Sequence, residues 1–143
     1  MACLAQLINV IAPLTTDDQG RLLKQTIYYP FELLTKYGRG SVLRTAIKGD
    51  LRDNGQSTVP AVHASCVLDE EAQEIRIFAL NSSLDHASEF IPEFRGFEKA
   101  KLTRHIALSG SDIAAQNTFD DPSRVIPHDR DITTSDHVDL PAA

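Results

Sequence analysis

The sequence predicts a mainly β protein: an antiparallel β-sandwich over residues 41–143, preceded over residues 1–40 by a strand and a helix of the parallel α/β type. Two observations carry this prediction. The chain opens with an almost unbroken apolar run from Ala2 to Leu14, typical of a strand buried on both faces of a parallel sheet. After Gly40, short strand-like runs alternate with turn signals, which is the pattern of an antiparallel sandwich.

The apolar opening run contains two amides, Gln6 and Asn9, which need hydrogen-bond partners if they are buried. Either each amide bonds the local backbone, or Gln6 lies at the carboxyl end of a barrel strand, where barrel enzymes hold their ligands. A parallel strand also needs neighbours on both edges and helices on its faces. Because no partner strand follows nearby, we expect this segment to come from a longer polypeptide.

A loop and a helix are predicted after the opening run. Residues 15–21 contain two aspartates and a glycine, which supply the chemistry of a turn. Pro30 suits the first turn of a helix predicted over Phe31–Tyr37, and Gly38 is expected to end that helix in a left-handed conformation.

An aromatic group precedes and enters the predicted helix, formed by Tyr28, Tyr29 and Phe31. Such a group is either a platform for a sugar ring or the seam between two domains, and the seam is the preferred interpretation.

Six strands are predicted in the second part of the chain. They are Ser41–Ile47, Ala61–Leu68, Glu74–Leu80, Ala87–Ile91, Ala100–Leu108 and His137–Leu140. The acidic turn between the second and third strands makes this pair the clearest hairpin, and alternation places Val62, Ala64 and Cys66 on one face of it. Residues 48–60 are predicted to be a mobile loop, and residues 112–136 a long surface connection.

Composition limits the possible partners. The chain has 14 basic and 20 acidic residues, a formal net charge of −6, which argues against a nucleic-acid surface. The opening run lacks the charged leader of a signal peptide and is too short to cross a bilayer, so no membrane partner is predicted. Cys3 and Cys66 lie in strand-like runs and indicate buried free thiols in a reducing compartment, the cytoplasm, although a disulfide between them stays an alternative.

Several stretches resemble one enzyme family. The strings ACLAQLINVIAPL, KQTIYYPFELLTKYGRG, CVLDEEAQEIRIFALN, RGFEKAKLTRHIALSG and NTFDDPSRVIP, which together span nearly the whole chain, resemble the end of the α-L-arabinofuranosidases of glycoside hydrolase family 51. The resemblance implies that residues 1–40 are the last strand and helix of a catalytic (β/α)8 barrel. It also implies that residues 41–143 are a jelly-roll-like carboxy-terminal sandwich, which would lack its final, tryptophan-containing strand here.

The same resemblance implies a retaining glycosidase, which uses two carboxylates about 5–5.5 Å apart. Both catalytic glutamates of the family would precede this chain, so no catalytic residue is predicted in it. Gln6 matches the family's glutamine that bonds the arabinofuranose ring. Asn9 and Gln25 are candidates for residues that support this site from a second layer, although the simpler interpretation of Asn9 is that it ties down the loop. The family also implies a homo-oligomer, commonly a hexamer.

Other arrangements of reactive residues are weak. The acidic trio Asp69, Glu70 and Glu71 sits in a hairpin turn, where solvent would keep the pKa values ordinary. His63 and Cys66 would point to opposite faces of a strand and could not share a metal ion. No metal site and no cofactor are predicted, and a glycosylation sequon at Asn81 is irrelevant in the cytoplasm.

Three functions follow as hypotheses. The preferred one is the carboxy-terminal part of an α-L-arabinofuranosidase that releases terminal arabinofuranose from arabinan or arabinoxylan oligosaccharides, with the isolated chain inactive. The alternatives are a free-standing carbohydrate-binding sandwich, which nine Phe and Tyr residues support poorly, and an oligomerisation module.

Overall fold

The structure is a computed structural model that describes residues 3–53, 55–97, 100–132 and 137–142. The described chain divides into two compact units. Unit 1 consists of residues 1–38 and 108–128, and unit 2 of residues 39–107 and 129–143. The predicted domains, with limits of 1–40 and 41–143, stay a prediction. They did not anticipate that residues 108–128 would group with the start of the chain.

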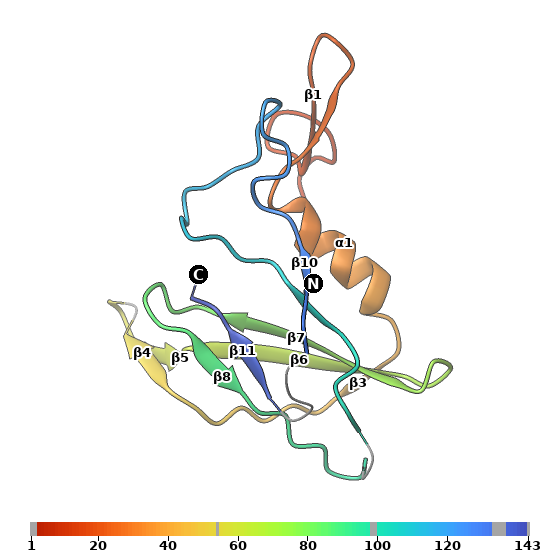
Figure 1. The fold of residues 1–143 in the computed structure, drawn as a ribbon, viewed down its shortest axis with the longest axis vertical. Coiled ribbons are helices and arrows are strands. Elements are labelled where there is room, and N and C mark those ends of the chain that lie inside the picture. Colours follow the sequence, from red (N-terminus) through yellow and green to blue (C-terminus); the bar gives the residue numbers. More distant parts are fainter. Residues whose placement is uncertain (1–2, 54, 98–99, 133–136, 143) are drawn as a thin grey trace. The chain divides into compact units, whose positions relative to one another are not determined.

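Unit 1 contains one hairpin and one helix (Figure 1). Strand β1 (Leu14–Thr16) pairs antiparallel with β2 (Leu22–Lys24), with Leu14 opposite Lys24. The turn between them is closed by Asp17, whose Oδ1 accepts the backbone N–H groups of Gln19 and Arg21 at 3.0 and 2.9 Å. The loop predicted over residues 15–21 is therefore the tip of a hairpin.

Helix α1 (Tyr28–Tyr37) starts three residues before the predicted first residue. Pro30 still falls in the first turn, where its missing N–H costs no helical hydrogen bond. Gly38 ends the helix, but the predicted left-handed conformation is wrong: its φ is −87° and ψ 19°. Its N–H instead donates to the carbonyl of Leu34 at 2.8 Å, so the chain leaves the helix through one more right-handed turn.

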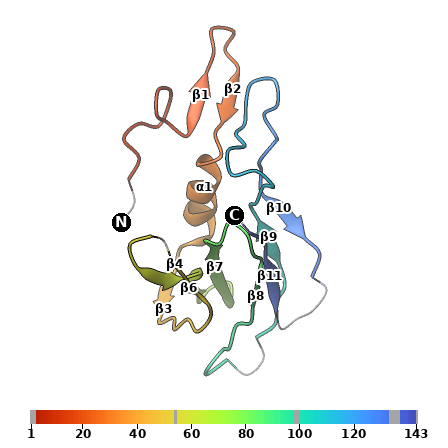
Figure 2. The ribbon, with the colours of Figure 1, turned by 90° about the vertical axis from the view of Figure 1, so that its left-hand side faces the viewer.

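Unit 2 is built from short antiparallel sheets around one long hairpin. Strands β6 (Val62–Asp69) and β7 (Glu74–Asn81) pair over their whole length, and β3 (Ser41–Leu43) adds to the other edge of β6. Two further pairs join β4 (Leu51–Asp53) to β5 (Thr58–Pro60) and β8 (Ser88–Phe90) to β11 (Val138–Leu140). Figure 1 shows the β6–β7 arrows beside each other, and Figure 2 the pair β8–β11.

A last two-stranded sheet places β10 (His128–Arg130) beside β9 (His105–Ala107). All six predicted strands are thus present, although four of them are only three residues long. The mainly β, antiparallel architecture predicted from the sequence is confirmed.

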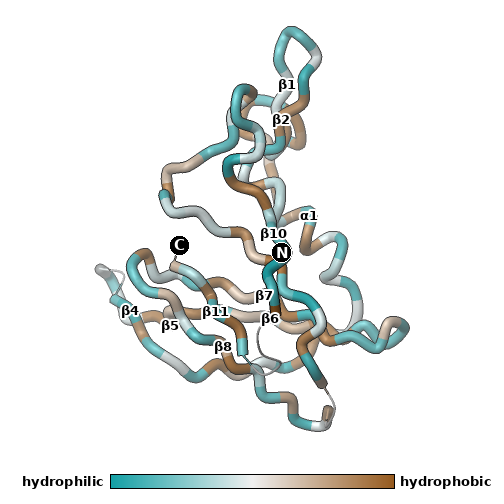
Figure 3. Tube along the Cα trace, viewed as in Figure 1, coloured by the Kyte–Doolittle hydropathy of each residue, from teal (hydrophilic) through white to brown (hydrophobic). Residues whose placement is uncertain are grey.

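The β6–β7 hairpin follows the predicted alternation on its first strand. His63 and Ser65 are exposed, whereas Cys66 is buried, and Val67 is buried on the opposite face. The turn that joins the strands is mostly hydrophilic (Figure 3). Burial on both faces near Cys66 indicates that the middle of the hairpin forms the core of unit 2.

Two further predictions are wrong in the structure. The apolar opening run forms no strand over residues 3–13 and is not buried on both faces: Val10 is 86% and Ile11 67% exposed, and Cys3 is exposed as well. The physical reason is that a parallel strand needs hydrogen-bonded neighbours on both edges, which the described residues do not supply. Only Ala12 and Pro13, next to β1, are buried.

The second error is the loop predicted over residues 48–60, which contains the β4–β5 hairpin. Its turn is stabilised by Asp53, whose Oδ1 accepts the N–H of Gly55 at 2.8 Å, and Gly55 has a φ of 83°. The Asn-Gly dipeptide at 54–55 is a strong hairpin signal that could have revealed this pair. In the connection predicted over 112–136, strand β10 was also missed, and residues 133–136 lie outside the described residues.

Gly40 joins the helix of unit 1 to the first strand of unit 2 under a strict backbone constraint. Its φ is +132°, and a Cβ atom there would overlap the carbonyl oxygen of Leu68. We expect Gly40→Ala to lower the free energy of unfolding by about 2 kcal/mol or more, because strain and overlap add. Urea denaturation measures this change.

Gly49→Ala is the matched control, since open space surrounds Gly49 and its φ is not positive. An equal urea midpoint for Gly40→Ala and the unmutated chain would show that the constraint at Gly40 is absent in solution.

Candidate functional site

The candidate site lies in unit 1, around residues 3–13, which we call the Gln6 loop. Gln6 is exposed, with its neighbours Leu7 and Ile8. Because an exposed amide offers one acceptor and two donors, Gln6 is free to meet a polar ligand such as a sugar hydroxyl. The role of Gln6 in substrate binding stays a prediction.

Asn9 attaches the Gln6 loop to strand β1. Its Nδ2 donates to Thr16 Oγ1 at 3.1 Å, and its Oδ1 accepts the backbone N–H of Thr16 at 2.7 Å. The backbone N–H of Asn9 donates to the carbonyl of Leu14 at 2.7 Å. This agrees with the expectation that Asn9 ties down the loop, whereas a second-layer role towards substrate stays untested.

The loop turns back at Asn9 and Val10, which have φ values of 61° and 58°. Asparagine tolerates this left-handed region, but a β-branched valine there is strained. The hydrogen bonds that Asn9 makes to β1 hold this backbone in place.

Gln25 follows strand β2 and contacts the same hairpin from the other side. Its Nε2 donates to Thr15 Oγ1 at 3.3 Å, and its backbone N–H donates to the carbonyl of Pro13 at 2.8 Å. Both bonds tie Gln25 to β1 and to the end of the Gln6 loop, while its predicted second-layer role stays a prediction.

Lys24 and the start of helix α1 form a charged and aromatic group. The Lys24 ammonium lies 4.5 Å from the centre of the Tyr28 ring and 3.4 Å from Glu32 Oε1. Partial burial opposes the charged form of Lys24, but the carboxylate of Glu32 and the oxygen of Tyr28 outweigh it and raise its pKa. Of the predicted aromatic group, Tyr29 is buried against Tyr28 edge-to-face, which leaves it unable to serve as an open sugar platform.

Asn117 is a buried polar residue that the sequence analysis did not single out. It is 2% exposed, its Nδ2 donates to the carbonyls of Lys24 and Val125 at 3.0 and 3.1 Å, and its Oδ1 accepts the N–H of Val125 at 2.8 Å. Nearby, the guanidinium of Arg21 lies 5.0 Å from the centre of the Phe119 ring. These contacts attach residues 117–125 to strand β2.

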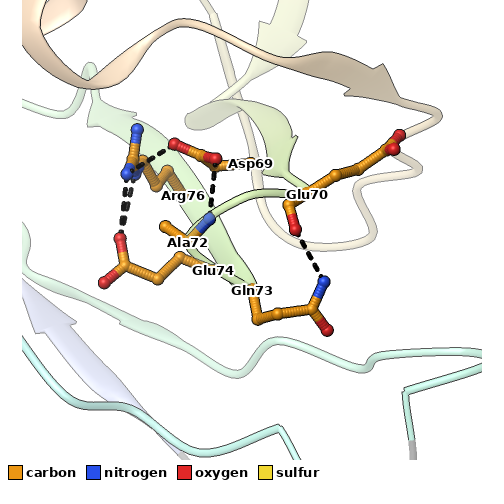
Figure 4. Close-up of polar contacts among 6 residues, drawn as sticks. All are labelled: Asp69, Glu70, Ala72, Gln73, Glu74 and Arg76. Atoms are coloured by element: carbon orange, nitrogen blue, oxygen red, sulfur yellow. Dashed lines mark hydrogen bonds and ion pairs between the residues drawn. The ribbon is translucent and has the colours of Figure 1, made fainter.

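The acidic trio of unit 2 lies in a turn, and Figure 4 shows the polar contacts that Asp69 and Glu70 make there. Asp69 Oδ1 accepts the N–H of Ala72 at 3.0 Å, and its Oδ2 pairs with Arg76 at 2.8 Å. The Ala72 N–H and the Arg76 guanidinium lower the pKa of Asp69. Glu70 and Glu71 are exposed, so the trio presents no enclosed carboxylate.

The remaining candidates are placed apart from one another. Cys3 and Cys66 are both free thiols; Cys3 is exposed, and burial raises the pKa of the Cys66 thiol. In the part of the chain that the structure describes, no three His, Cys, Asp or Glu side chains gather closely enough to hold a metal ion. Asn81 of the sequon is buried, with its Nδ2 donating to the carbonyls of His86 and Pro141.

No helix among the described residues is long and apolar enough to cross a membrane. The only helix described, α1, has ten residues, which is about half the length that a bilayer core requires.

Comparison with known proteins gives a consistent result. Residues 1–143 match the family described as the α-L-arabinofuranosidase C-terminal domain. The chain is 36% identical over 135 residues to an intracellular exo-α-(1→5)-L-arabinofuranosidase of Streptomyces lividans, with 94% of this chain and 20% of the relative covered. It is 40% identical over 129 residues to intracellular exo-α-(1→5)-L-arabinofuranosidase 1 of Bacillus subtilis, with 90% of this chain and 25% of the relative covered.

A solved structure agrees with these relatives. A family 51 α-L-arabinofuranosidase from Bifidobacterium longum superimposes with a TM-score of 0.84 at 29% identity, covering 96% of this chain and 28% of that one. The chain therefore spans about a fifth to a quarter of the length of the curated relatives named here.

The contacts of Asp69 predict the pH dependence of unit 2. A carboxyl whose pKa is lower in the folded chain than its ordinary value of 3.8 adds stability above that value, and this stability is lost as the pH falls through the lowered pKa. We expect Asp69→Asn to weaken the loss of stability below about pH 4, which urea midpoints between pH 6 and pH 3 measure.

Glu71→Gln, at the exposed position two residues on, serves as the control and should keep the acid dependence of the unmutated chain. The same acid dependence in Asp69→Asn and the unmutated chain would contradict the role of Asp69.

Proposed function

The chain belongs to the family of α-L-arabinofuranosidase C-terminal domains, and from this premise we propose that it is the carboxy-terminal part of a retaining α-L-arabinofuranosidase. The proposed reaction is hydrolysis of terminal, non-reducing α-L-arabinofuranosyl residues of arabinan or arabinoxylan oligosaccharides. The observation that carries the proposal is the family match over residues 1–143, together with relatives named as arabinofuranosidases at 36–40% identity.

We infer that the acids that cleave the glycosidic bond lie outside this chain. A glycosidase needs a carboxylic acid whose pKa is raised, so that it can donate a proton near neutral pH. The contacts described for Asp69 lower its pKa, and hydrogen bonds from Arg21 outweigh partial desolvation and lower the pKa of Asp17 too. Both carboxylates are therefore suited to structural ion pairs, and neither is suited to act as the proton donor.

Gln6 is the residue that we propose to bind the arabinofuranosyl ring. Its exposure in a loop that Asn9 and Gln25 tie to β1 supports this assignment, because a ligand-binding amide must be accessible on a defined backbone. Asn9 and Gln25 would then support the site from behind, without touching the sugar.

The exposed apolar side chains of the Gln6 loop fit the same proposal. Leu7, Ile8, Val10 and Ile11 are all more than half exposed. Burying such a side chain is worth about 1.5–3 kcal/mol, so contact with the rest of an enzyme would stabilise this loop.

We propose a cytoplasmic homo-oligomer as the setting of the enzyme, with no cofactor, nucleic acid or membrane as partner. The word "intracellular" in the names of the relatives supports the location. Exposed apolar side chains of unit 2, among them Val42 at 80% and Leu80 at 60%, support a contact with another subunit.

The first test concerns the activity of the chain alone. We expect the purified 143-residue chain to release no product from an aryl α-L-arabinofuranoside, because we infer that both catalytic glutamates of the enzyme lie outside this chain. A colorimetric assay against a mock preparation measures this, and turnover above the mock would contradict the assignment of the acids.

The second test restores the missing part. A chimera in which this chain replaces the carboxy-terminal quarter of the Bacillus subtilis relative should hydrolyse the same aryl substrate. In that chimera, Gln6→Ala should lower kcat/KM about tenfold, as expected for the loss of about 1.4 kcal/mol of hydrogen bonding in the transition state.

Gln19→Ala is the matched control for the chimera, since Gln19 is an exposed glutamine at the tip of the β1–β2 hairpin. An unmutated chimera that folds but stays inactive would overturn the proposed function. Equal activity of Gln6→Ala and Gln19→Ala would overturn the role of Gln6 alone.

A further inference from the structure

Two hydrogen bonds and one pairing of neighbouring strands connect Asn117 to the Gln6 loop. Asn117 Nδ2 donates to the carbonyl of Lys24 at 3.0 Å. Lys24 is the register partner of Leu14 in the β1–β2 hairpin. The carbonyl of Leu14 in turn accepts the N–H of Asn9 at 2.7 Å, so only two residues separate Asn117 from the turn of the loop.

Every polar group of the Asn117 side chain is hydrogen-bonded in this position. Both amide hydrogens and the carbonyl oxygen have partners, and the residue is 2% exposed. Because a buried amide without partners costs about 1–3 kcal/mol for each unsatisfied group, the site tolerates few other side chains. Its partners belong to segments that lie 93 and 8 residues away in the sequence.

A second contact supports the same attachment. The Arg21 guanidinium lies over the Phe119 ring at 5.0 Å, and Asp17 holds Arg21 through its Nε at 2.6 Å. The turn that follows Asn117 is itself closed, since Thr118 Oγ1 accepts the N–H of Asp121 at 3.0 Å. Residues 117–121 therefore contact the hairpin at both β2 and its tip.

We propose that Asn117 is a positioning residue for substrate binding, in that it holds the β1–β2 hairpin so that the Gln6 loop keeps one backbone conformation. The proposal rests on the proposed function of Gln6. Residues 108–128 would then contribute to substrate binding by supporting the Gln6 loop. They follow that loop by about a hundred residues in the sequence but belong to the same unit, unit 1.

Hydrogen exchange of the 143-residue chain tests the attachment without any assay of activity. Asn117→Ala should accelerate exchange of the Asn9, Thr16 and Gln25 amides about tenfold or more, because their hydrogen bonds depend on the hairpin that Asn117 holds. Amides of the β6–β7 ladder should keep their protection.

Asn81→Ala is the matched control, because Asn81 is also a buried asparagine with three donated contacts and one accepted contact, but in unit 2. It should leave exchange at Asn9, Thr16 and Gln25 unchanged. Equal exchange at these three amides in Asn117→Ala and the unmutated chain would overturn the proposal.

A milder variant covers the case in which Asn117→Ala unfolds the whole chain. Thr118→Val removes only the hydroxyl that closes the 118–121 turn, and it should accelerate exchange at the same three amides about threefold. No acceleration in this variant would overturn the proposal as well.

The chimera described above separates positioning from general stability. Asn117→Ala should lower kcat/KM. The parameter that changes, kcat or KM, should be the same one that changes in Gln6→Ala. The double variant should lose little more than the stronger single variant, since both changes remove one interaction. Asn81→Ala should change neither parameter below its unfolding temperature.

The outcomes distinguish the two proposals. An inactive but folded unmutated chimera would end the proposed function, whereas the exchange data would still decide whether Asn117 holds the loop. Additive losses from Gln6→Ala and Asn117→Ala in an active chimera would overturn the positioning role and leave the proposed function standing.

Discussion

The antiparallel ladder between β6 and β7 is the interaction on which unit 2 depends. It pairs eight residues on each strand, from Val62 opposite Asn81 to Asp69 opposite Glu74, whereas the pairs β1–β2, β3–β6, β4–β5 and β8–β11 have three each. A three-residue strand pair is only marginally stable by itself. The long ladder therefore supplies the surface on which β3 forms, and Cys66 and Val67 bury its two faces.

Unit 1 is organised by different means, because its strands are too short to form a sheet with a buried face. Its buried residues are few, among them Ala12, Pro13, Leu23 and Tyr29. Polar side chains also stabilise this unit: Asn9 accepts the backbone N–H of Thr16, seven residues away, and Asn117 donates to the carbonyl of Lys24, 93 residues away. Such bonds are directional, so they define one loop conformation, whereas a small apolar core would allow several.

The apolar opening segment shows how far secondary-structure preference depends on context. Leu7, Ile8, Val10 and Ile11 favour a buried strand, yet they lie in an exposed loop that turns back at Asn9. Strand formation requires edge partners, and within the described residues the only bridge that this segment makes joins Ile8 to Leu14. The barrel that the resemblance to family 51 enzymes implies would supply those partners.

The sequence by itself determined the class of fold, the position of the long hairpin, the helix near Pro30 and the family, since alternation, turn residues and long matching strings are local properties. It also singled out Gln6 and the loop-holding role of Asn9. Tertiary structure alone decided that the opening run is a loop and that residues 108–128 join unit 1. It alone revealed that Asn117, in a polar stretch with no periodic signal, is buried against Lys24. The physical reason is that a hydrogen bond between residues 93 positions apart leaves no local pattern, because each partner looks like an ordinary loop residue until the chain brings them together.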